Sequence, residues 1–171
     1  MNHIANIAAT LLYRSKSNVL SNSRLTMLIY LCDWKSCLVT NKPLTELNWH
    51  YENNGPFSWE VIKAVIYSRK HFEISKSLGS FISFNTTVKL IVYNEEIQNS
   101  LSSYSNNIID FVIKQTNALD NEQFTSLILS TYPVMSSQKF TDLNLKRLSV
   151  EYKSSRLWSK DAASLELGDL Y

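Results

Sequence analysis

Glycine, proline, cysteine and histidine are all scarce in this chain, and each shortage disfavours a class of function. Among 171 residues there are three Gly, three Pro, two Cys and three His. So few glycines and prolines leave no room for long flexible linkers or low-complexity tracts. The glycines also stand far apart, which argues against a glycine-rich phosphate-binding loop. The Cys and His residues show none of the ligand spacings of a zinc site. We therefore expect no metal ion and no cofactor.

The two cysteines do not have the setting of catalytic or disulfide-bonded residues. Cys32 and Cys37 lie five residues apart on one predicted helix, so they rise ~7.5 Å and point to different sides. A nucleophilic pair of either thiol with His50 or His71 has no supporting motif, because no glycine turn or nucleophile elbow precedes a cysteine. We expect reduced thiols that pack as small hydrophobic groups, and no catalytic residue.

The chain also lacks segments that would send it to or through a membrane. Its first residues, MNHIANIAATLLYRSKS, have neither the basic start nor the long apolar core of a signal peptide. No run approaches the ~20 apolar residues that a membrane-spanning helix needs. The sequence thus predicts a soluble, cytoplasmic protein without a membrane partner.

Charge is balanced overall but differs between the two halves. The net charge is +2, from 17 Lys and Arg against 15 Asp and Glu, which is too even to indicate nucleic-acid binding by itself. Residues 1–92 hold 10 basic and 5 acidic side chains, whereas residues 93–171 hold 7 basic and 10 acidic ones. A binding face and a random scatter of solvated charges both remain open.

Hydrophobic periodicity predicts a mainly helical protein of the α+β class. The stripe of Ile4, Ile7, Ala8, Leu11 and Leu12 predicts a first helix, and helical spacing returns in residues 24–39, 58–69, 97–119, 124–131 and 142–152. Between residues 72 and 93 the period changes to two, which predicts two or three short strands with a hairpin turn near Asn85. We expect a single-domain helical bundle with a small antiparallel β-hairpin over residues 1–155, followed by a C-terminal tail, residues 156–171, that is flexible or binds a partner.

The segment from Arg24 to Ser68 is the most informative part of the sequence. Its first helix is apolar on all sides, so it should be packed on all sides, and Asp33 in its middle should find a cation or a hydrogen-bond donor. Gly55 and Pro56 predict the start of a second helix, with proline at the first helical position and Gly55 or Asn54 as the cap. Four features follow one another along this segment. They are a helix with the motif L-x-Y-L-x-D-W, a turn with the sequence K-P-L-T, a connector with the motif W-x-Y-x-x-x-G-P-F, and a further helix.

This pattern resembles the Panacea domain of SocA-like antitoxins. The matching residues are Leu28, Tyr30, Leu31, Asp33, Pro43, Leu44, Thr45, Trp49, Tyr51, Gly55, Pro56 and Phe57. The resemblance extends over roughly residues 5–150. It implies a structural role for Tyr30, Asp33, Pro43, Trp49, Gly55 and Pro56.

The resemblance implies a protein-binding module rather than an enzyme. Such a module neutralises a cognate toxin or effector by direct binding or by delivering it to a protease, and it can belong to a phage-defence system. Aromatic side chains on a fixed loop are good anchors for a protein partner, so Tyr51, Phe57 and Trp59 are the candidate partner-binding residues.

The alternative is a winged-helix-like DNA-binding regulator. In that interpretation the helix from Ser58 to Arg69 precedes a hairpin that carries Lys76 and Lys89, and Lys63, Arg69 and Lys70 contact phosphates. Most residues of this helix are apolar, however, which favours a helix that packs in the core over one that reads DNA.

Overall fold

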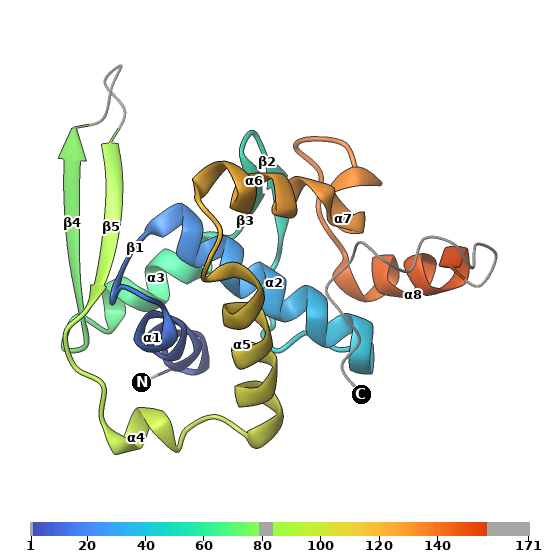
Figure 1. Cartoon of the computed structure of the whole chain (residues 1–171). Helices are drawn as coiled ribbons and strands as arrows, with labels where there is room; N and C mark the ends of the chain where they lie inside the picture. The colour runs from blue at the N-terminus through green and yellow to red at the C-terminus, as the bar shows by residue number, and fades with distance from the viewer. Residues whose placement is uncertain (1, 79–83, 157–171) are drawn as a thin grey trace.

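The computed structural model describes residues 2–78 and 84–156 (Figure 1). The helices are α1 (His3–Arg14), α2 (Asn22–Thr40), α3 (Trp59–Tyr67), α4 (Glu95–Gln98), α5 (Ser103–Thr116), α6 (Asn121–Ser130), α7 (Tyr132–Met135) and α8 (Leu145–Arg156). The strands are β1 (Val19–Ser21), β2 (His50–Glu52), β3 (Gly55–Phe57), β4 (Phe72–Leu78) and β5 (Phe84–Leu90). The predicted fold class, mainly helical α+β, is confirmed. The predicted tail lies outside the described residues except for Arg156.

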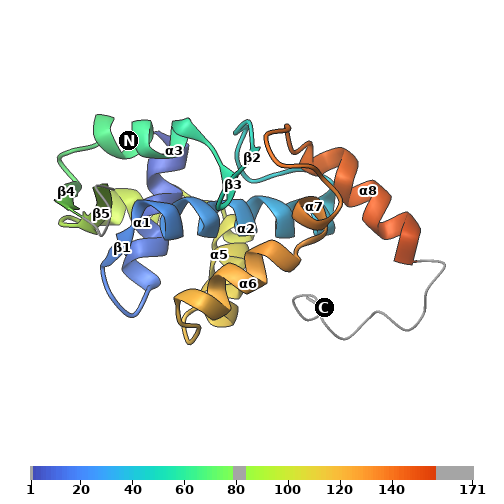
Figure 2. The same cartoon turned by 90° about the horizontal axis from the view of Figure 1, so that it is seen from above.

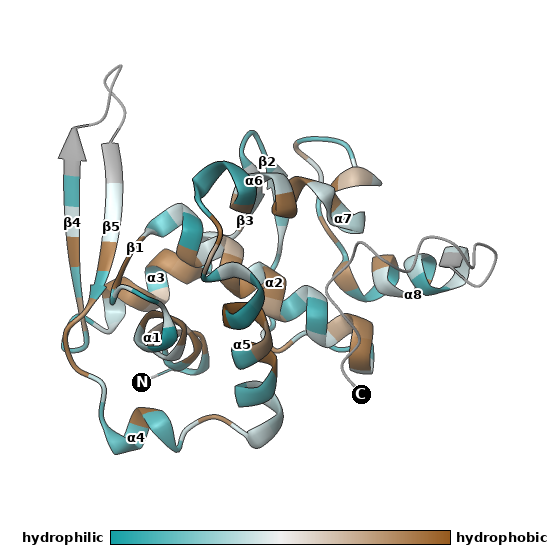
Figure 3. Ribbon diagram, viewed as in Figure 1, coloured by the Kyte–Doolittle hydropathy of each residue, from teal (hydrophilic) through white to brown (hydrophobic). Residues whose placement is uncertain are grey.

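Helix α2 runs through the centre of the molecule, and most other elements pack on it (Figures 1 and 2). It contacts α1, α3, α5 and α8 as well as β1, β3 and β5. Every residue from Leu25 to Cys37 is buried, so the helix has no solvent-facing stripe. Figure 3 shows hydrophobic segments gathered where α1, α2 and α5 lie side by side. The core therefore surrounds α2, as its apolar composition on all sides predicted.

The two sheets lie at different edges of this helical frame. Strands β1, β5 and β4 form an antiparallel sheet in that order, and its long β4–β5 hairpin projects from the body (Figure 1). Strands β2 and β3 form a separate two-stranded ribbon beside α2. A predicted hairpin turn near Asn85 is wrong: Asn85 pairs with Ser77 inside the β4–β5 ladder, and the connection falls on residues 79–83, which are outside the described residues.

The predicted start of the second helix at Gly55 and Pro56 is wrong. Both residues belong to β3, and α3 begins at Trp59 with Ser58 at its N-cap position. Pro56 lies opposite Tyr51 in the ribbon. A proline fits this short two-stranded ribbon because an edge strand can leave one position without an N–H donor. The Asn53-Asn54 turn, rather than a helix cap, thus explains the polar residues before Gly55.

Two other helix starts also differ from the predicted ones. Helix α2 begins at Asn22, ahead of the predicted range 24–39, because the side chain of Ser21 caps it by accepting a hydrogen bond from the N–H of Arg24. Helix α8 begins at Leu145 rather than near Asp142, because Asn144 accepts a hydrogen bond from the N–H of Arg147. The residues before Asn144 stay extended and pair with β2. Helix α5 begins at Ser103 with Ser102 as its N-cap, and Asp120 and Gln123 form a capping box at the start of α6.

Candidate partner-binding site

A buried carboxylate fastens the aromatic connector, residues 41–49, to the central helix. Asp33 is fully buried on α2. It accepts hydrogen bonds from the N–H of Thr45 at 2.8 Å, from the Thr45 hydroxyl, and from Nε1 of Trp49 at 2.9 Å. Burial raises the pKa of Asp33 to about 6, while the hydrogen bonds from Thr45 and Trp49 oppose that rise. The expected donors for Asp33 are therefore present, and both residues that supply them lie in the connector.

Two further residues of the resemblance belong to the same part of the structure, Tyr30 on α2 and Pro43 in the connector. The ring of Tyr30 packs edge-on against Trp49 with centroids 5.6 Å apart, and its hydroxyl shares a hydrogen bond of 2.8 Å with Oγ1 of Thr131. Pro43 is half-buried at the start of the connector. The connector and the end of α6 are thus held on α2 from two sides.

Glycine at position 55 is required by both backbone and space. Gly55 has φ +126°, a region that side chains rarely adopt. A Cβ at this position would lie 3.2 Å from Cε of Met27 and 3.3 Å from Cγ2 of Ile128. Gly55 therefore lets β3 approach α2 and α6 closely, which sets the place of the residues that follow.

The structure separates the three predicted partner-binding residues into two groups. Phe57 and Trp59 lie together, edge to face, with ring centroids 5.0 Å apart, and Trp59 is 65% exposed. Tyr51 is directly opposite Pro56 and packs partly against the core. Because neighbouring residues of a strand point to opposite faces, Tyr51 and Phe57 lie on different sides of the ribbon. Phe57 and Trp59 form the accessible pair.

Sequence reasoning missed an exposed aromatic residue next to the ribbon. Phe140 is 66% exposed and has φ +66°, which is unusual for a bulky residue. Its N–H donates to the carbonyl of Tyr51 at 2.5 Å, and the N–H of Tyr51 donates to the carbonyl of Thr141 at 2.9 Å. These hydrogen bonds attach residues 140–143 to β2 as a further extended segment. No local sequence signal marks Phe140, since its conformation depends on pairing with a segment almost ninety residues earlier.

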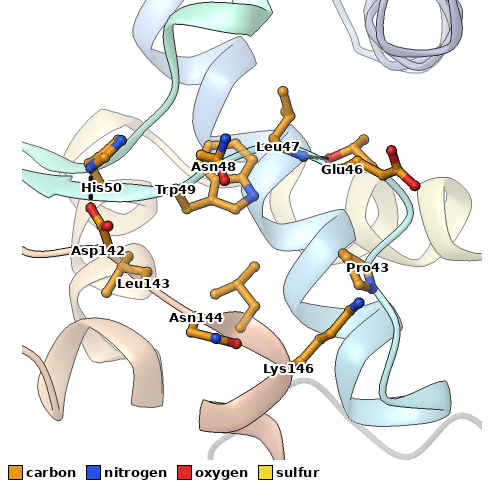
Figure 4. A pocket seen from close by; sticks show the side chains of 12 residues that line it. Pro43, Glu46, Leu47, Asn48, Trp49, His50, Asp142, Leu143, Asn144 and Lys146 are labelled. Carbon is orange, nitrogen blue, oxygen red and sulfur yellow. Dashed lines mark hydrogen bonds and ion pairs between the residues drawn. The ribbon is translucent and has the colours of Figure 1, made fainter.

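A cleft of about 650 Å³ separates the connector from the segment that leads into α8 (Figure 4). Trp49 and Leu143 line it, and at one end Nδ1 of His50 lies 2.6 Å from Oδ1 of Asp142. Glu46 and Lys146 add charges of opposite sign near the other end. The cleft is thus lined by apolar side chains together with charged groups of both signs.

The described residues do not assemble a metal-binding group, and both cysteines are buried. Within residues 2–78 and 84–156, no cluster of three His, Cys, Asp or Glu side chains has the proximity needed to hold a metal ion. Both cysteines are buried and free, and burial raises the pKa of Cys32 well above its ordinary value and that of Cys37 to about 12. Neither sulfur is thus a ready thiolate nucleophile.

The chain matches the model of one protein family over more than half of its length. The family model described as antitoxin SocA-like, Panacea domain, matches residues 25–131. This chain belongs to that family. The matched span of the Panacea domain runs from Leu25 in α2 to Thr131, directly after α6, and contains Asp33, Trp49, the ribbon and α3. It is shorter than the resemblance at both ends, so Phe140 and α8 lie outside it.

No curated protein and no solved structure matches the chain. Across the two described ranges, no helix of this Panacea-family chain combines the length and hydrophobicity needed to cross a membrane.

Proposed function

We propose that this protein neutralises a toxin or effector protein by binding it directly through an aromatic surface. That surface consists of Phe57, Trp59 and Phe140, which we call the ribbon aromatics. Membership of an antitoxin family supports an antitoxin role. The observation that carries the proposed surface is the exposure of two aromatic side chains, Trp59 at 65% and Phe140 at 66%, on backbone fixed to the ribbon.

The physical argument rests on how protein interfaces gain affinity. A few aromatic or arginine anchors supply most of the binding energy, and rigid anchors lose little conformational entropy on binding. Asp33 fixes the connector before β2, and the hydrogen bonds of Tyr51 fix Phe140. The ribbon aromatics are therefore presented in a preorganised form.

Co-expression with the product of a neighbouring gene tests the proposal. The expected result is co-purification of the two proteins and rescue of growth when that product is toxic. Trp59→Ala and Phe140→Ala should each weaken the complex at least roughly tenfold, as expected for central anchors. Tyr13→Ala is the matched control, because Tyr13 is 59% exposed on α1, outside the ribbon. Loss of binding in all three variants, or in none, would refute the proposed surface.

The same experiment separates direct neutralisation from delivery to a protease. Direct binding predicts that the purified protein inhibits the toxin in the absence of any protease. Delivery predicts a shorter toxin half-life in cells and no inhibition by the purified protein alone. A role in phage defence is a further part of the proposal, tested by plaque counts with and without the gene pair.

A second candidate function, binding of duplex DNA, is favoured by the order of the elements. Helix α3 is followed by the projecting β4–β5 hairpin, and β5 pairs with β1, an arrangement found in winged-helix proteins. The prediction that α3 is a core element was wrong in part, since Ile66 and Tyr67 are 37% and 84% exposed. Lys63, Arg69, Lys70 and Lys76 are exposed nearby.

Two details make protein binding the preferred function. Between Trp59 and Tyr67 the only basic residue is Lys63, and no Arg, Asn or Gln is present to read base edges. On the hairpin, Nζ of Lys89 lies 3.6 Å from Glu73, so part of its charge is compensated. Tight binding of duplex DNA whose affinity falls by orders of magnitude between low and physiological salt, without a protein partner, would reverse this preference.

A further inference from the structure

Two buried polar atoms on the first turns of α2 have no hydrogen-bond partner. They are Oδ1 of Asn22 and Oγ1 of Thr26, and among buried side-chain nitrogen and oxygen atoms of the described residues no others lack one. Thr26 is only 2% exposed. Nearly all buried polar groups in proteins are hydrogen-bonded, so an unpaired pair, one helical turn apart, points to a ligand that completes it.

Both residues line one cavity of about 450 Å³ between α2 and the β2–β3 ribbon. Met27 and Pro56 contribute apolar surface, and Phe57 and Trp59 form an aromatic wall. Gly55 also lines this cavity, so the close approach of β3 to α2 shapes it. The cavity thus combines unpaired polar atoms with an exposed indole.

The charge of the lining has one sign. Glu52 is exposed at the cavity, and no Lys, Arg or His lines it. No cation forms an ion pair with Glu52 among the described residues. The N-terminus of α2 would favour an anion, but Ser21 already caps the N–H of Arg24, and the one charged side chain of the lining is the carboxylate of Glu52. The carboxylate therefore makes the cavity a site for a cation.

We propose that this cavity receives an arginine side chain of the protein partner. A guanidinium has five N–H donors and no acceptor, which suits the free oxygens of Asn22 and Thr26 and the carboxylate of Glu52. Its flat face can stack on Trp59, the aromatic residue that attracts cations best. A lysine ammonium has three donors and no flat face, so it satisfies fewer of these groups. The inference deepens the proposed function, because it names the chemistry of the residue that the partner supplies.

The cavity can be tested without knowing the partner. The probe is N-acetyl-arginine amide, followed by NMR through the indole signal of Trp59 and the side-chain amide signals of Asn22. N-acetyl-citrulline amide has nearly the same shape without the charge, and N-acetyl-norleucine amide has only the apolar chain. The arginine probe should bind roughly tenfold more tightly than the citrulline probe, from the loss of one cation–π contact and one ion pair. Equal or tighter binding of either neutral probe, or shifts that avoid Trp59 and Asn22, would overturn the proposal.

Variants of the lining give a second, independent test. Glu52→Gln should weaken the arginine probe roughly threefold or more and leave the citrulline probe unchanged. Glu46→Gln is the control, because Glu46 is an exposed carboxylate that lines the other cleft. Thr26→Val should raise the melting temperature, since it removes an unpaired buried hydroxyl, and should weaken the probe. A lower melting temperature for Thr26→Val would show that the hydroxyl serves the fold and would overturn its assignment to the ligand.

The partner complex distinguishes failure of this inference from failure of the proposed function. If no protein partner is captured by the wild-type chain, the proposed function fails, and the probe titration still decides the cavity. If a partner is captured, Glu52→Lys should weaken the complex at least roughly tenfold, because like charges then meet. A complex that tolerates Glu52→Lys would leave direct neutralisation standing and refute the arginine site.

Discussion

Trp49 donates its indole N–H to Oδ2 of Asp33 over 2.9 Å, in a region where both residues are buried. Together with the two hydrogen bonds from Thr45, this contact ties the connector to α2. Without the carboxylate, the donors of Thr45 and Trp49 would stay buried and unpaired. Loss of the Asp33 carboxylate should therefore lower the stability of the fold.

Asp33→Ala should lower the free energy of unfolding by roughly 3 kcal/mol or more, since each unpaired buried group costs about 1–3 kcal/mol. Urea unfolding followed by fluorescence measures the change. Asp110→Ala is the matched control: Asp110 forms a surface ion pair with Arg14, so its loss should cost less than about 1 kcal/mol. Unchanged stability of Asp33→Ala together with lost partner binding would instead make Asp33 a binding residue.

The same carboxylate predicts a particular pH dependence. Its pKa in the folded state is about 6, whereas an aspartate in the unfolded chain titrates near ~3.9. Because the folded state holds the proton more tightly, the contribution of Asp33 to stability is greatest below about pH 4 and is lost as the pH rises to about 6. Asp33→Asn does not titrate at this position.

The stability of the wild type relative to Asp33→Asn should therefore fall by up to ~3 kcal/mol as the pH rises through this window. Urea titrations at several pH values between about 4 and 7 measure the difference, and other carboxylates cancel because both proteins contain them. A rise with pH would mean that the hydrogen bonds of Thr45 and Trp49 outweigh burial.

Substitutions at the start of β3 should differ sharply in effect. Gly55→Val should destabilise the protein by roughly 3 kcal/mol, through a strained positive φ and close contacts with Met27 and Ile128. Pro56→Ala should cost only about 1 kcal/mol, because alanine tolerates the backbone conformation of proline. Thermal unfolding of both variants checks the order. Similar losses at the two positions would remove the special role of Gly55.

Phe140 should contribute to binding and not to folding. Asparagine adopts positive φ more readily than phenylalanine, so Phe140→Asn should leave stability unchanged or raise it by about 1 kcal/mol. Partner affinity should fall at least roughly tenfold. Met135→Ala serves for comparison, since Met135 is 72% exposed without a positive φ. Reduced stability with intact binding in Phe140→Asn would assign the ring to the fold.

The features that depend on local pattern were accessible from the sequence. The helices with a clear apolar stripe and the need of Asp33 for donors both follow from nearby residues. The helix start near Gly55 was misplaced because Gly-Pro is compatible with a helix start and with an edge strand, and only pairing with Tyr51 decides between them.

The features that depend on distant contacts were not accessible. Phe140 owes its conformation to the carbonyl of Tyr51, and Thr26 looks like any polar residue of a helix until its neighbours are known. The candidate aromatic residues likewise depend on strand register. The register of the ribbon places Phe57 on the side where it contacts Trp59, and it places Tyr51 on the other side. Register is set by tertiary packing as well as by the turn.

The unbroken burial of α2 from Leu25 to Cys37 limits which amino-acid substitutions the protein can accept. Between Leu25 and Cys37, apart from Thr26, a saturation mutagenesis profile should show intolerance at each position, without the rhythm of three to four residues expected along α1 or α5. The ribbon packs on that helix from outside, and residues 140–143 are hydrogen-bonded to the ribbon in turn. Substitutions in these peripheral segments can therefore accumulate, and alter which protein is bound, while the helix that carries them is held nearly invariant by its own packing.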